Sequence, residues 1–442
     1  MSNASTPTRP KSCNDCAVST KLPTGWRTAR LGDVCCIVPG FAFSSKDWRT
    51  EGIPVIKIKN IQSDCTVDLT ETDFVPASLL TPKLDKFVLK DGDVLIAMTG
   101  ATAGKVGKLR TNGALLLNQR VAKIEAFAAD RDYIWSVVSS HEYQSRFFYL
   151  ADGAAQPNMS GGQIEGIEIP LPPPATQTVI GAILSAYDDL IENNTRRIQI
   201  LERMAQALYR EWFVNFRFPG HTKVKHVASP LGPIPQGWET KKLRDICERV
   251  DYGYTASANR EPVGPKFLRI TDIVPSMIDW PAVPYCELDG DDVEKYRLEA
   301  GDIVVARTGA TTGYAKRLNK RHPESVFASY LVRLRVRRPN SSHVFGLRVE
   351  SDDYKQFIKT NLSGSAQPQA NAQVLTSLPI VTPPPQLQAA FTRIVEPMLD
   401  QKEILEVKNV NLCRTCDLLL PKVISGALDV SKLEIETGST SP

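Results

Sequence analysis

The chain has 442 residues, 42% of them hydrophobic and 23% charged, and its formal net charge is +4. Such a length exceeds what one ordinary core supports, so we expect two or more domains. The mean hydropathy is −0.20, and the sequence holds no uninterrupted apolar run of about 18 residues, which excludes a membrane span. The small net charge argues against a protein that coats nucleic acid indiscriminately.

The N-terminal segment, residues 1–20, is polar and lacks the apolar core of a secretory signal. We therefore expect a disordered tail and a cytoplasmic protein. The nine cysteines include two CxxC pairs, Cys13–Cys16 and Cys413–Cys416. Free thiols are the default in a reducing compartment, and a shared zinc site would need the two chain ends to meet. We favour a structural or incidental role for both pairs and predict no metal site.

Residues 21–170 alternate short strands and turns, and they form the first predicted domain. Gly92 and Asp93 precede a β-branched run, which predicts a turn that enters a buried strand. The segment from Gly100 to Lys105 resembles a phosphate-binding loop. However, only three residues separate its glycines, and Val106 stands where Ser or Thr is required, so we expect no nucleotide site.

A long helix is predicted over residues 171–217, after the Pro172–Pro174 run. Apolar residues follow a 4-3 spacing for more than four heptads, which is typical of a coiled-coil seam. About 33 residues of helix would span about 50 Å. Asn194 is a polar member of this seam, of the kind that fixes register at a cost in stability. Residues 218–234 are the predicted linker.

The second half repeats the first with a period near 211 residues. The Gly-Trp and Leu-x-Asp openings, the Gly-Asp turns, the Thr-Gly-Ala-Thr segments, the Ala-Gln-Pro segments and the Pro-Pro-Pro runs return in one order. These landmarks include Trp26 and Trp238, Gly92 and Gly301, Thr99 and Thr308, Gln156 and Gln367, and Pro172 and Pro383. The chain is therefore an internal duplication.

The repeat predicts a second domain at residues 235–380, a second spacer helix at 381–428 and a flexible tail at 429–442. Lys402 and Asn409 make the second seam more polar than the first. Cys416 lies on this seam at the position equivalent to Ala205, where a small apolar core role explains it without a metal. Two long amphipathic helices can bury their apolar faces by packing against each other, so we expect the two spacer helices to pair.

No catalytic constellation is visible in either half. The five histidines are scattered and have no matched copies, and the Pro runs lack the flanking residues of an amino-methyltransferase motif. What both halves share is small and polar: Thr99 and Thr102 match Thr308 and Thr311, with basic residues nearby. Such loops suit phosphate contacts, and longer side chains can then reach base edges. The alternative is that Thr-Gly-Ala-Thr is only a demanding turn between strands, and both readings can hold together.

The candidate DNA-binding residues are polar or basic and lie in or near the repeated segments. They are Lys57, Lys59, Asn60, Thr99, Thr102, Lys105, Lys108, Arg120, Arg269, Arg307, Thr308, Thr311, Lys316, Arg317 and Tyr330. The candidate partner-docking residues lie on the predicted helices. They are Tyr187, Ile191, Asn194, Ile198, Leu201, Trp212, Leu405, Leu412 and Leu419.

These landmarks, together with the segment from Gln156 to Ile164 and the Pro run before a long helix, resemble type I restriction-modification specificity subunits. The resemblance covers residues 22–428, although the second half has Gln369-Ala370-Asn371 where the first has a fuller motif. It implies an α+β fold with two target-recognition domains of mixed α/β structure. These domains are joined by two long antiparallel coiled-coil helices and are related by an internal pseudo-twofold repeat.

The resemblance also implies a function and a set of partners. Each half would read one part of a bipartite double-stranded DNA target, and the chain itself would not be an enzyme. Modification methyltransferase subunits, expected to be two, would dock on the helices and methylate adenine with S-adenosylmethionine. Restriction subunits would use ATP and Mg²⁺ to translocate and cleave DNA. Two alternatives remain open, namely a stand-alone nuclease and a duplicated protein-binding scaffold.

Overall fold

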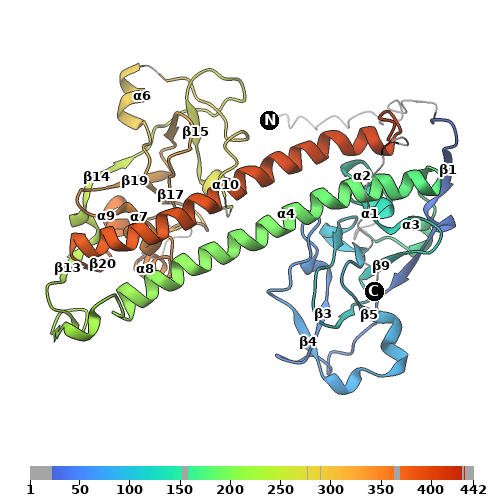
Figure 1. Ribbon diagram of the computed structural model, residues 1–442, viewed down its shortest axis with the longest axis horizontal. Coiled ribbons are helices and arrows are strands. Elements are labelled where there is room, and N and C mark those ends of the chain that lie inside the picture. Colours follow the sequence, from blue (N-terminus) through green and yellow to red (C-terminus); the bar gives the residue numbers. More distant parts are fainter. Residues whose placement is uncertain are drawn as a thin grey trace, which may run out of the picture. The chain divides into compact units, whose positions relative to one another are not determined.

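The computed structural model describes residues 22–151, 158–275, 277–288, 290–362, 369–430 and residue 433. The predicted tail with Cys13–Cys16, the segments containing Gln156 and Gln367, and most of the predicted C-terminal tail lie outside these residues. The chain divides into two compact units, one of residues 1–191 and 412–442 and the other of residues 192–411. Each unit therefore combines one half of the repeat with segments of both long helices (Figure 1).

The first unit is built on three small sheets. Its strands are β1 (Arg27–Arg30), β2 (Cys35–Pro39), β3 (Ile53–Ile56), β4 (Asp73–Val75), β5 (Val88–Leu89), β6 (Val94–Ala97), β7 (Val106–Lys108), β8 (Leu115–Leu117), β9 (Val121–Ala126) and β10 (Glu168–Leu171). The strand orders are β2-β9-β6-β7, β4-β3-β8-β5 and β1-β10. The helices α1 (Arg131–Ser139), α2 (His141–Ala151) and α3 (Gly161–Glu165) follow β9.

The second unit repeats two of these sheets strand for strand. Its strands are β11 (His226–Val227), β12 (Ile234–Pro235), β13 (Glu239–Lys242), β14 (Cys247–Tyr252), β15 (Lys266–Leu268), β16 (Ile303–Ala306), β17 (Ala315–Arg317), β18 (Ser325–Phe327), β19 (Leu331–Val336) and β20 (Pro379–Thr382). The order β14-β19-β16-β17 matches β2-β9-β6-β7, and β13-β20 matches β1-β10. The structure thus confirms that the repeated landmarks mark a repeated fold.

The two units differ in the segment between β2 and β6 of the first unit, which corresponds to the segment between β14 and β16 of the second. The first unit pairs β3 with both β4 and β8, whereas the second pairs β15 with β18 alone within a sheet. The short helix α5 (Ile270–Ile273) takes the place of a 3-10 turn at Ile58–Asn60, and α6 (Gly290–Tyr296) takes the place of a 3-10 turn at Pro82–Phe87. The helices α7 (Ser342–Val349), α8 (Asp352–Asn361) and α9 (Ala372–Thr376) then take the places of α1, α2 and α3.

The predicted Gly-Asp turns lead into fully buried strands. Gly92 and Gly301 have φ angles of 77° and 94°, which residues with a Cβ atom adopt reluctantly. The strands that follow, β6 and β16, are buried at all four positions because sheet partners lie on both sides and helices or loops cover both faces. This prediction is confirmed.

The long helices are α4 (Pro174–Tyr209), extended by a π-turn at Arg210–Val214, and α10 (Pro385–Ile424). Each begins at the last proline of its Pro run, where the missing N–H costs nothing. In the first unit, Ile180 and Leu184 of α4 share a core with Val423 and Ile424 of α10. This arrangement buries the N-terminal part of one helix beside the C-terminal part of the other.

In the second unit the same antiparallel pairing continues. Asn194 donates to Asn409 at 2.9 Å, and Lys402 pairs with Glu202 at 2.5 Å. Trp212 packs against Phe391, with ring centroids 5.7 Å apart. Residue numbers rise along α4 as they fall along α10, so the predicted antiparallel helix pair is confirmed.

The described cysteines are free thiols. Cys416 is partly buried against the core of the first unit, and Cys413 is exposed on α10. Burial raises the pKa of Cys416 to about 11, which keeps the thiol protonated at neutral pH. Among the described residues, no group of three or more His, Cys, Asp or Glu side chains is placed to hold a metal ion.

Candidate nucleic-acid interface

The Thr-Gly-Ala-Thr segment of the first unit lies between two other loops. The main-chain N–H of Met98 donates to the carbonyl of Arg120 at 3.0 Å, which ties the segment to the turn between β8 and β9. The N–H of Met159 donates to the carbonyl of Met98 at 2.9 Å, and Thr99 forms a β-bridge with Asn158. Loops far apart in the sequence are therefore fixed to one another by backbone hydrogen bonds.

A fourth segment, after β2, completes this surface. Phe41 donates its N–H to the carbonyl of Leu117 at 2.8 Å and accepts from the N–H of Gln119 at 2.9 Å. We define the first platform as residues 40–43, 98–103, 117–121 and 158–160. Because its loops are joined through backbone atoms, their side chains are free to vary without loss of the framework.

The second unit builds the same surface. The corresponding N–H to carbonyl bonds are Arg307 to Tyr330 (3.0 Å), Ala370 to Arg307 (2.8 Å), Tyr254 to Phe327 (2.8 Å) and Ser329 to Tyr254 (2.8 Å). Thr308 forms a β-bridge with Gln369, as Thr99 does with Asn158. We define the second platform as residues 253–256, 307–312, 327–331 and 369–371.

The threonines of the first platform shape its turn. The hydroxyl oxygens of Thr99 and Thr102 are buried and have no hydrogen-bond partner among the described residues. Thr308 and Thr311 are half-buried at the same turn of the second copy. Since an enclosed hydroxyl cannot reach a phosphate, the geometry favours the structural reading of Thr99 and Thr102.

Two candidates stand at the tips of the platforms. Arg120 is exposed, and Tyr330 is 60% exposed at the equivalent turn. Arg307 belongs to the second platform. Its guanidinium lies 4.8 Å from the centre of the Tyr252 ring and donates to the carbonyl of Ser329 at 3.4 Å. A stacked guanidinium of this kind is held in place while its remaining N–H groups can still donate to a ligand.

Lys105 and Lys108 follow the first platform but differ in their surroundings. Lys105 is half-exposed. Lys108 is only 10% exposed, pairs with Asp132 at 2.8 Å and lies 5.7 Å from the centre of the Trp135 ring. Of these two lysines, only Lys105 is placed to neutralise a phosphate without first breaking an internal ion pair.

Lys57, Lys59 and Asn60 form a separate cluster. Both lysines pair with Asp73, at 3.0 and 3.2 Å, and Lys57 lies 3.4 Å from the centre of the Trp48 ring. Asn60 is 2% exposed, and its amide accepts from the N–H of Lys57 and donates to the carbonyl of Asp68. Asn60 therefore holds a turn, and its burial argues against its being one of the DNA-binding candidates that reach a ligand.

Arg269 is the equivalent basic residue of the second unit. Its guanidinium makes a bidentate ion pair with the carboxylate of Asp272, at 3.0 and 2.9 Å, while the Arg269 side chain remains 39% exposed. Both partners lie within one short segment, so the pair shapes the start of α5 and still presents one edge of the guanidinium to solvent.

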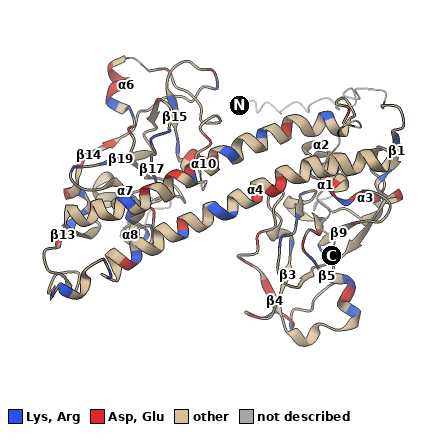
Figure 2. Cartoon of the chain, in the orientation of Figure 1, with Lys and Arg blue, Asp and Glu red and all other residues tan. Residues whose placement is uncertain are grey.

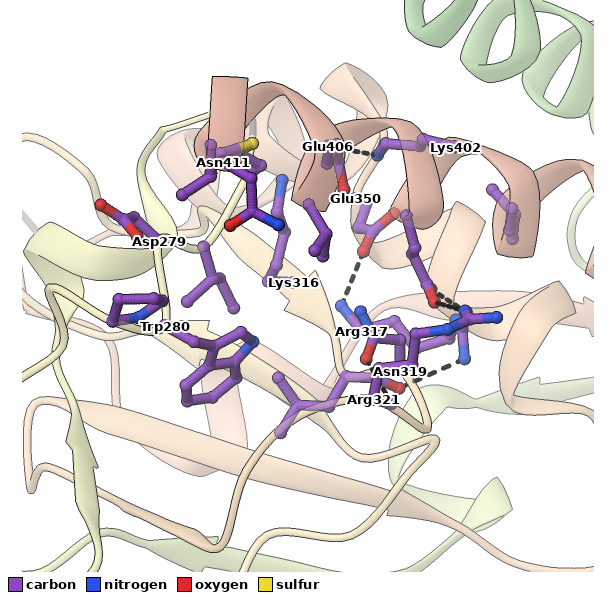
Figure 3. Close-up of a pocket in the computed structure, with 18 residues that line it drawn as sticks. Asp279, Trp280, Lys316, Arg317, Asn319, Arg321, Glu350, Lys402, Glu406 and Asn411 are labelled. Atoms are coloured by element: carbon purple, nitrogen blue, oxygen red, sulfur yellow. Dashed lines mark hydrogen bonds and ion pairs between the residues drawn. The ribbon is translucent and has the colours of Figure 1, made fainter. Parts of the chain in front are cut away.

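Lys316 and Arg317 lie away from the second platform, on β17 where it faces α10. Together with Lys402 and Glu406 of α10, Lys316 lines a cavity of about 220 Å³ (Figure 3). Burial lowers the pKa of Lys316. Arg317 is 12% exposed, lies 3.8 Å from Glu403 and donates its N–H to Glu350 at 2.6 Å. These contacts correct the expectation that the pair holds phosphates, because both side chains belong to the joint between the domain and its helix.

Further ion pairs join this domain to α10. Lys320 pairs with Asp400 at 2.7 Å, and Arg321 pairs with Glu403 at 3.0 Å. In the first unit, Arg110 of the loop after β7 pairs with Asp189 of α4 at 2.8 Å. Asp189 and Asp400 are equivalent in the repeat, so each domain is tied to its own spacer helix by cations of the same loop.

The predicted partner-docking residues lie mainly in the seam between the helices. Asn194, Trp212 and Leu405 are buried, and the remaining members are half-buried. The buried members correct the expectation of docking at those positions, since helix pairing already covers them. The exposed large apolar residues of α4 are Leu190, Ile200 and Met204, on its outer face. Figure 2 shows charged residues of both signs spaced along both helices.

The sequence did not identify several residues that the fold brings into the platforms. They are Phe41, Met98, Gln119, Asn158, Tyr254, Ser329 and Gln369. Five of them lie within two residues of a predicted landmark or candidate, whereas no such residue lies near Phe41 or Tyr254. The hydrogen bonds that join them link segments far apart in the sequence, which local spacing does not reveal.

Residues 23–203 and 235–412 match the family described as "Type I restriction modification DNA specificity domain". The two matches follow the two halves of the repeat and together cover more than half of the chain. The chain belongs to this family. As a specificity subunit, it contributes recognition to a type I restriction-modification system, not catalysis. No helix of the described residues is long and apolar enough to cross a membrane.

This specificity subunit is similar to others along most of its length. It is 23% identical over 426 residues to the MjaIX specificity subunit of Methanocaldococcus jannaschii, covering 93% of this chain and 96% of the relative. It is 24% identical over 438 residues to the EcoKI specificity subunit of Escherichia coli K12, covering 92% and 90%. The crystal structure of an S subunit from M. genitalium has a TM-score of 0.60 at 15% identity and covers 92% of this chain and 97% of that one, which supports the fold.

Proposed function

We propose that this specificity subunit reads a split double-stranded DNA target, one part with each platform. The observation that supports this most directly is the duplication of one backbone-fixed surface on two separate units. A protein that read a single contiguous site would need only one such surface. Loops carried on a rigid scaffold are the usual place for recognition residues.

We assign different tasks to different residues in and around the platforms. Lys105, Arg269 and Arg307 contact phosphates, which orient the protein on the duplex without carrying sequence information. Lys57 and Lys59 add positive charge beside the first platform. Thr99, Thr102, Thr308 and Thr311 hold the turns, and the exposed side chains at the tips enter the major groove.

The partners follow from family membership. Modification methyltransferase subunits, two per chain, dock on the outer faces of the helices, where Leu190, Ile200 and Met204 are 52%, 42% and 48% exposed. Restriction subunits join that assembly. S-adenosylmethionine, ATP and Mg²⁺ bind to these partners, which methylate adenine or cleave DNA, and the complex works in the cytoplasm on chromosomal DNA.

Selection from a random DNA library tests this proposal, with the chain alone and with its methyltransferase partner. A split consensus of two short sequences separated by a fixed gap is expected. Mg²⁺-dependent cleavage of plain duplex by the purified chain would instead indicate a stand-alone nuclease. Binding to the partner without any sequence preference would indicate a protein scaffold, and either result would overturn the proposal.

A further inference from the structure

The two platforms have the same backbone but different side chains. Four pairs of backbone hydrogen bonds match between them, with lengths that differ by no more than 0.1 Å. The paired platform residues nevertheless differ in chemistry: Phe41 and Tyr254, Met98 and Arg307, Gln119 and Ser329, Arg120 and Tyr330, and Asn158 and Gln369. Within one chain, the framework was therefore kept while side chains carried on it diverged.

Two buried positions under the same loops stayed apolar in both copies. Val121 and Leu331 are both 0% exposed and apolar, as are Leu117 and Phe327. The turn threonine at positions 99 and 308 is identical in both copies. Divergence also reaches enclosed positions, since Met98 is 8% exposed and belongs to the core of the first unit. At the position of Arg120 and Tyr330, however, both side chains are exposed, so their difference does not serve packing and indicates different ligands.

Among the divergent positions, that of Arg120 and Tyr330 is the most strongly presented. The N–H of Val121 donates to the carbonyl of Asn118 at 2.9 Å, and the N–H of Leu331 donates to Ala328 at 2.8 Å, so each residue sits in a closed turn. The carbonyl oxygens of Arg120 and Tyr330 accept hydrogen bonds from the N–H groups of Met98 and Arg307, respectively. The backbone is fixed on both sides while the side chain is exposed, which is the preorganisation that base recognition requires.

The chemistry of the two side chains predicts different bases. A guanidinium can donate two parallel hydrogen bonds to O6 and N7 of guanine in the major groove. The phenol of tyrosine offers one hydroxyl and an apolar ring, which cannot make that two-toothed contact. The same position would therefore select guanine in one half-site and a different base in the other.

We propose that Arg120 and Tyr330 are specificity-determining residues, each reading a base in the half-site of its own platform, and that Arg120 reads guanine. This inference rests on the proposed function. Because Arg120 and Tyr330 are structurally equivalent, this one position would then select different bases in the two half-sites.

The test is site selection with the specificity chain assembled with its methyltransferase partner. Arg120→Ala should abolish a guanine preference at one position of one half-site, by roughly 5- to 150-fold. The other half-site should stay unchanged. Arg120→Lys keeps the charge but not the fork, so it should lose most of the same preference while keeping affinity for non-specific DNA. Tyr330→Ala should alter one position of the other half-site only.

Lys83→Ala removes an exposed cation of the first unit outside the platform and is the matched control, with no change in preference expected. Equal loss of affinity for all sequences in Arg120→Ala would make Arg120 a phosphate contact and overturn the inference. Unchanged selection by both alanine variants would also overturn it. If the unaltered complex selected no sequence at all, the proposed function itself would be the part that failed.

Discussion

Two neighbouring lysines of the first domain make opposite predictions for salt dependence. Lys105→Ala should make the plot of log affinity against log salt shallower by about 0.9, because one phosphate contact and its counterion release are lost. Lys108→Ala should leave that slope unchanged, since its ammonium is already neutralised by Asp132 at 2.8 Å. Filter binding or anisotropy over a salt series measures both. Equal slope changes in the two variants would show that the Asp132 pair opens on DNA.

A half-buried histidine of α7, His343, gives the second unit a pH dependence. Burial, with the nearby cations Arg317 and Lys320 outweighing Asp400, lowers the pKa of His343 from 6.5 to about 4. Its neutral form is therefore favoured by folding. The unfolded chain binds the proton more readily than the folded one between these two values, so this contribution is fully present above pH 6.5 and is lost as the pH falls toward 4.

As the pH falls from 6.5 to 4, the free energy of unfolding should decrease less for His343→Gln than for the unaltered chain. The difference should be at most about 3 kcal/mol. Urea unfolding at several pH values between 4 and 7 measures the difference, in which the titration of carboxylates common to both proteins cancels. His141→Gln, at an exposed position of α2, serves as the control and should follow the unaltered chain. Parallel pH curves for His343→Gln and the unaltered chain would refute the assignment.

At the scale of elements, a polar pair marks the seam of the long helices. Asn194 and Asn409 are 8% and 9% exposed and hydrogen-bonded at 2.9 Å, and Asn409 also donates to Thr195 at 3.1 Å. Asn409→Ala should destabilise the protein by about 1–3 kcal/mol because the Asn194 amide is left buried without this partner. Chemical denaturation measures the loss.

Replacing both residues, Asn194→Leu with Asn409→Leu, should recover that stability, because two apolar side chains need no hydrogen bond. If the pair fixes register, the double variant should recognise its split target with a less defined gap. A double variant as unstable as Asn409→Ala would show instead that the seam cannot accommodate leucine there.

The sequence pattern predicted the long helices better than it predicted which candidate residues lie exposed on the surface. The 4-3 spacing and the Pro runs located α4 and α10 to within a few residues at their starts, because both signals are local. Pro397, which ordinarily breaks or kinks a helix, lies inside α10 (Pro385–Ile424) nonetheless, since tertiary packing outweighs one lost hydrogen bond. Antiparallel pairing was reached through the resemblance, and the structure supplies the contacts.

Exposure of the basic residues could not be read from the sequence. Lys105 and Lys316 both follow a Thr-Gly-Ala-Thr segment, yet Lys316 is enclosed because it lines a cavity together with Lys402 and Glu406 of α10. Asn60 was a candidate as a polar residue near the repeated segments, but its amide donates to the carbonyl of Asp68 within its own loop. Burial depends on segments distant in the sequence, so residue type and spacing overestimated the nucleic-acid interface.

At the scale of the whole molecule, each half should be exchangeable. The core of the first unit includes Ile180 and Leu184 of α4 with Val423 and Ile424 of α10, so an exchange limited to residues 22–170 splits that core. Replacing residues 22–191 together with 412–430 by the equivalent parts of a relative keeps it intact. One half-site should change and the other should not, as measured by library selection. A change in both half-sites would show that the platforms do not read independently.

The long helices should set the distance between the half-sites, because each runs from one unit of the chain into the other. A heptad inserted into both, after Ile198 and after Leu405, falls between the Asn194–Asn409 and Glu202–Lys402 contacts and keeps the seam in phase. Each helix lengthens by about 10 Å. At about 3.4 Å per base pair, that corresponds to about three extra pairs.

The preferred gap between half-sites, selected from a DNA library with a randomised spacer, should grow accordingly. Affinity should fall, because three pairs also turn the second half-site by roughly a third of a turn around the duplex. An unchanged gap in a folded variant that still binds its methyltransferase would mean that the helices do not set this distance.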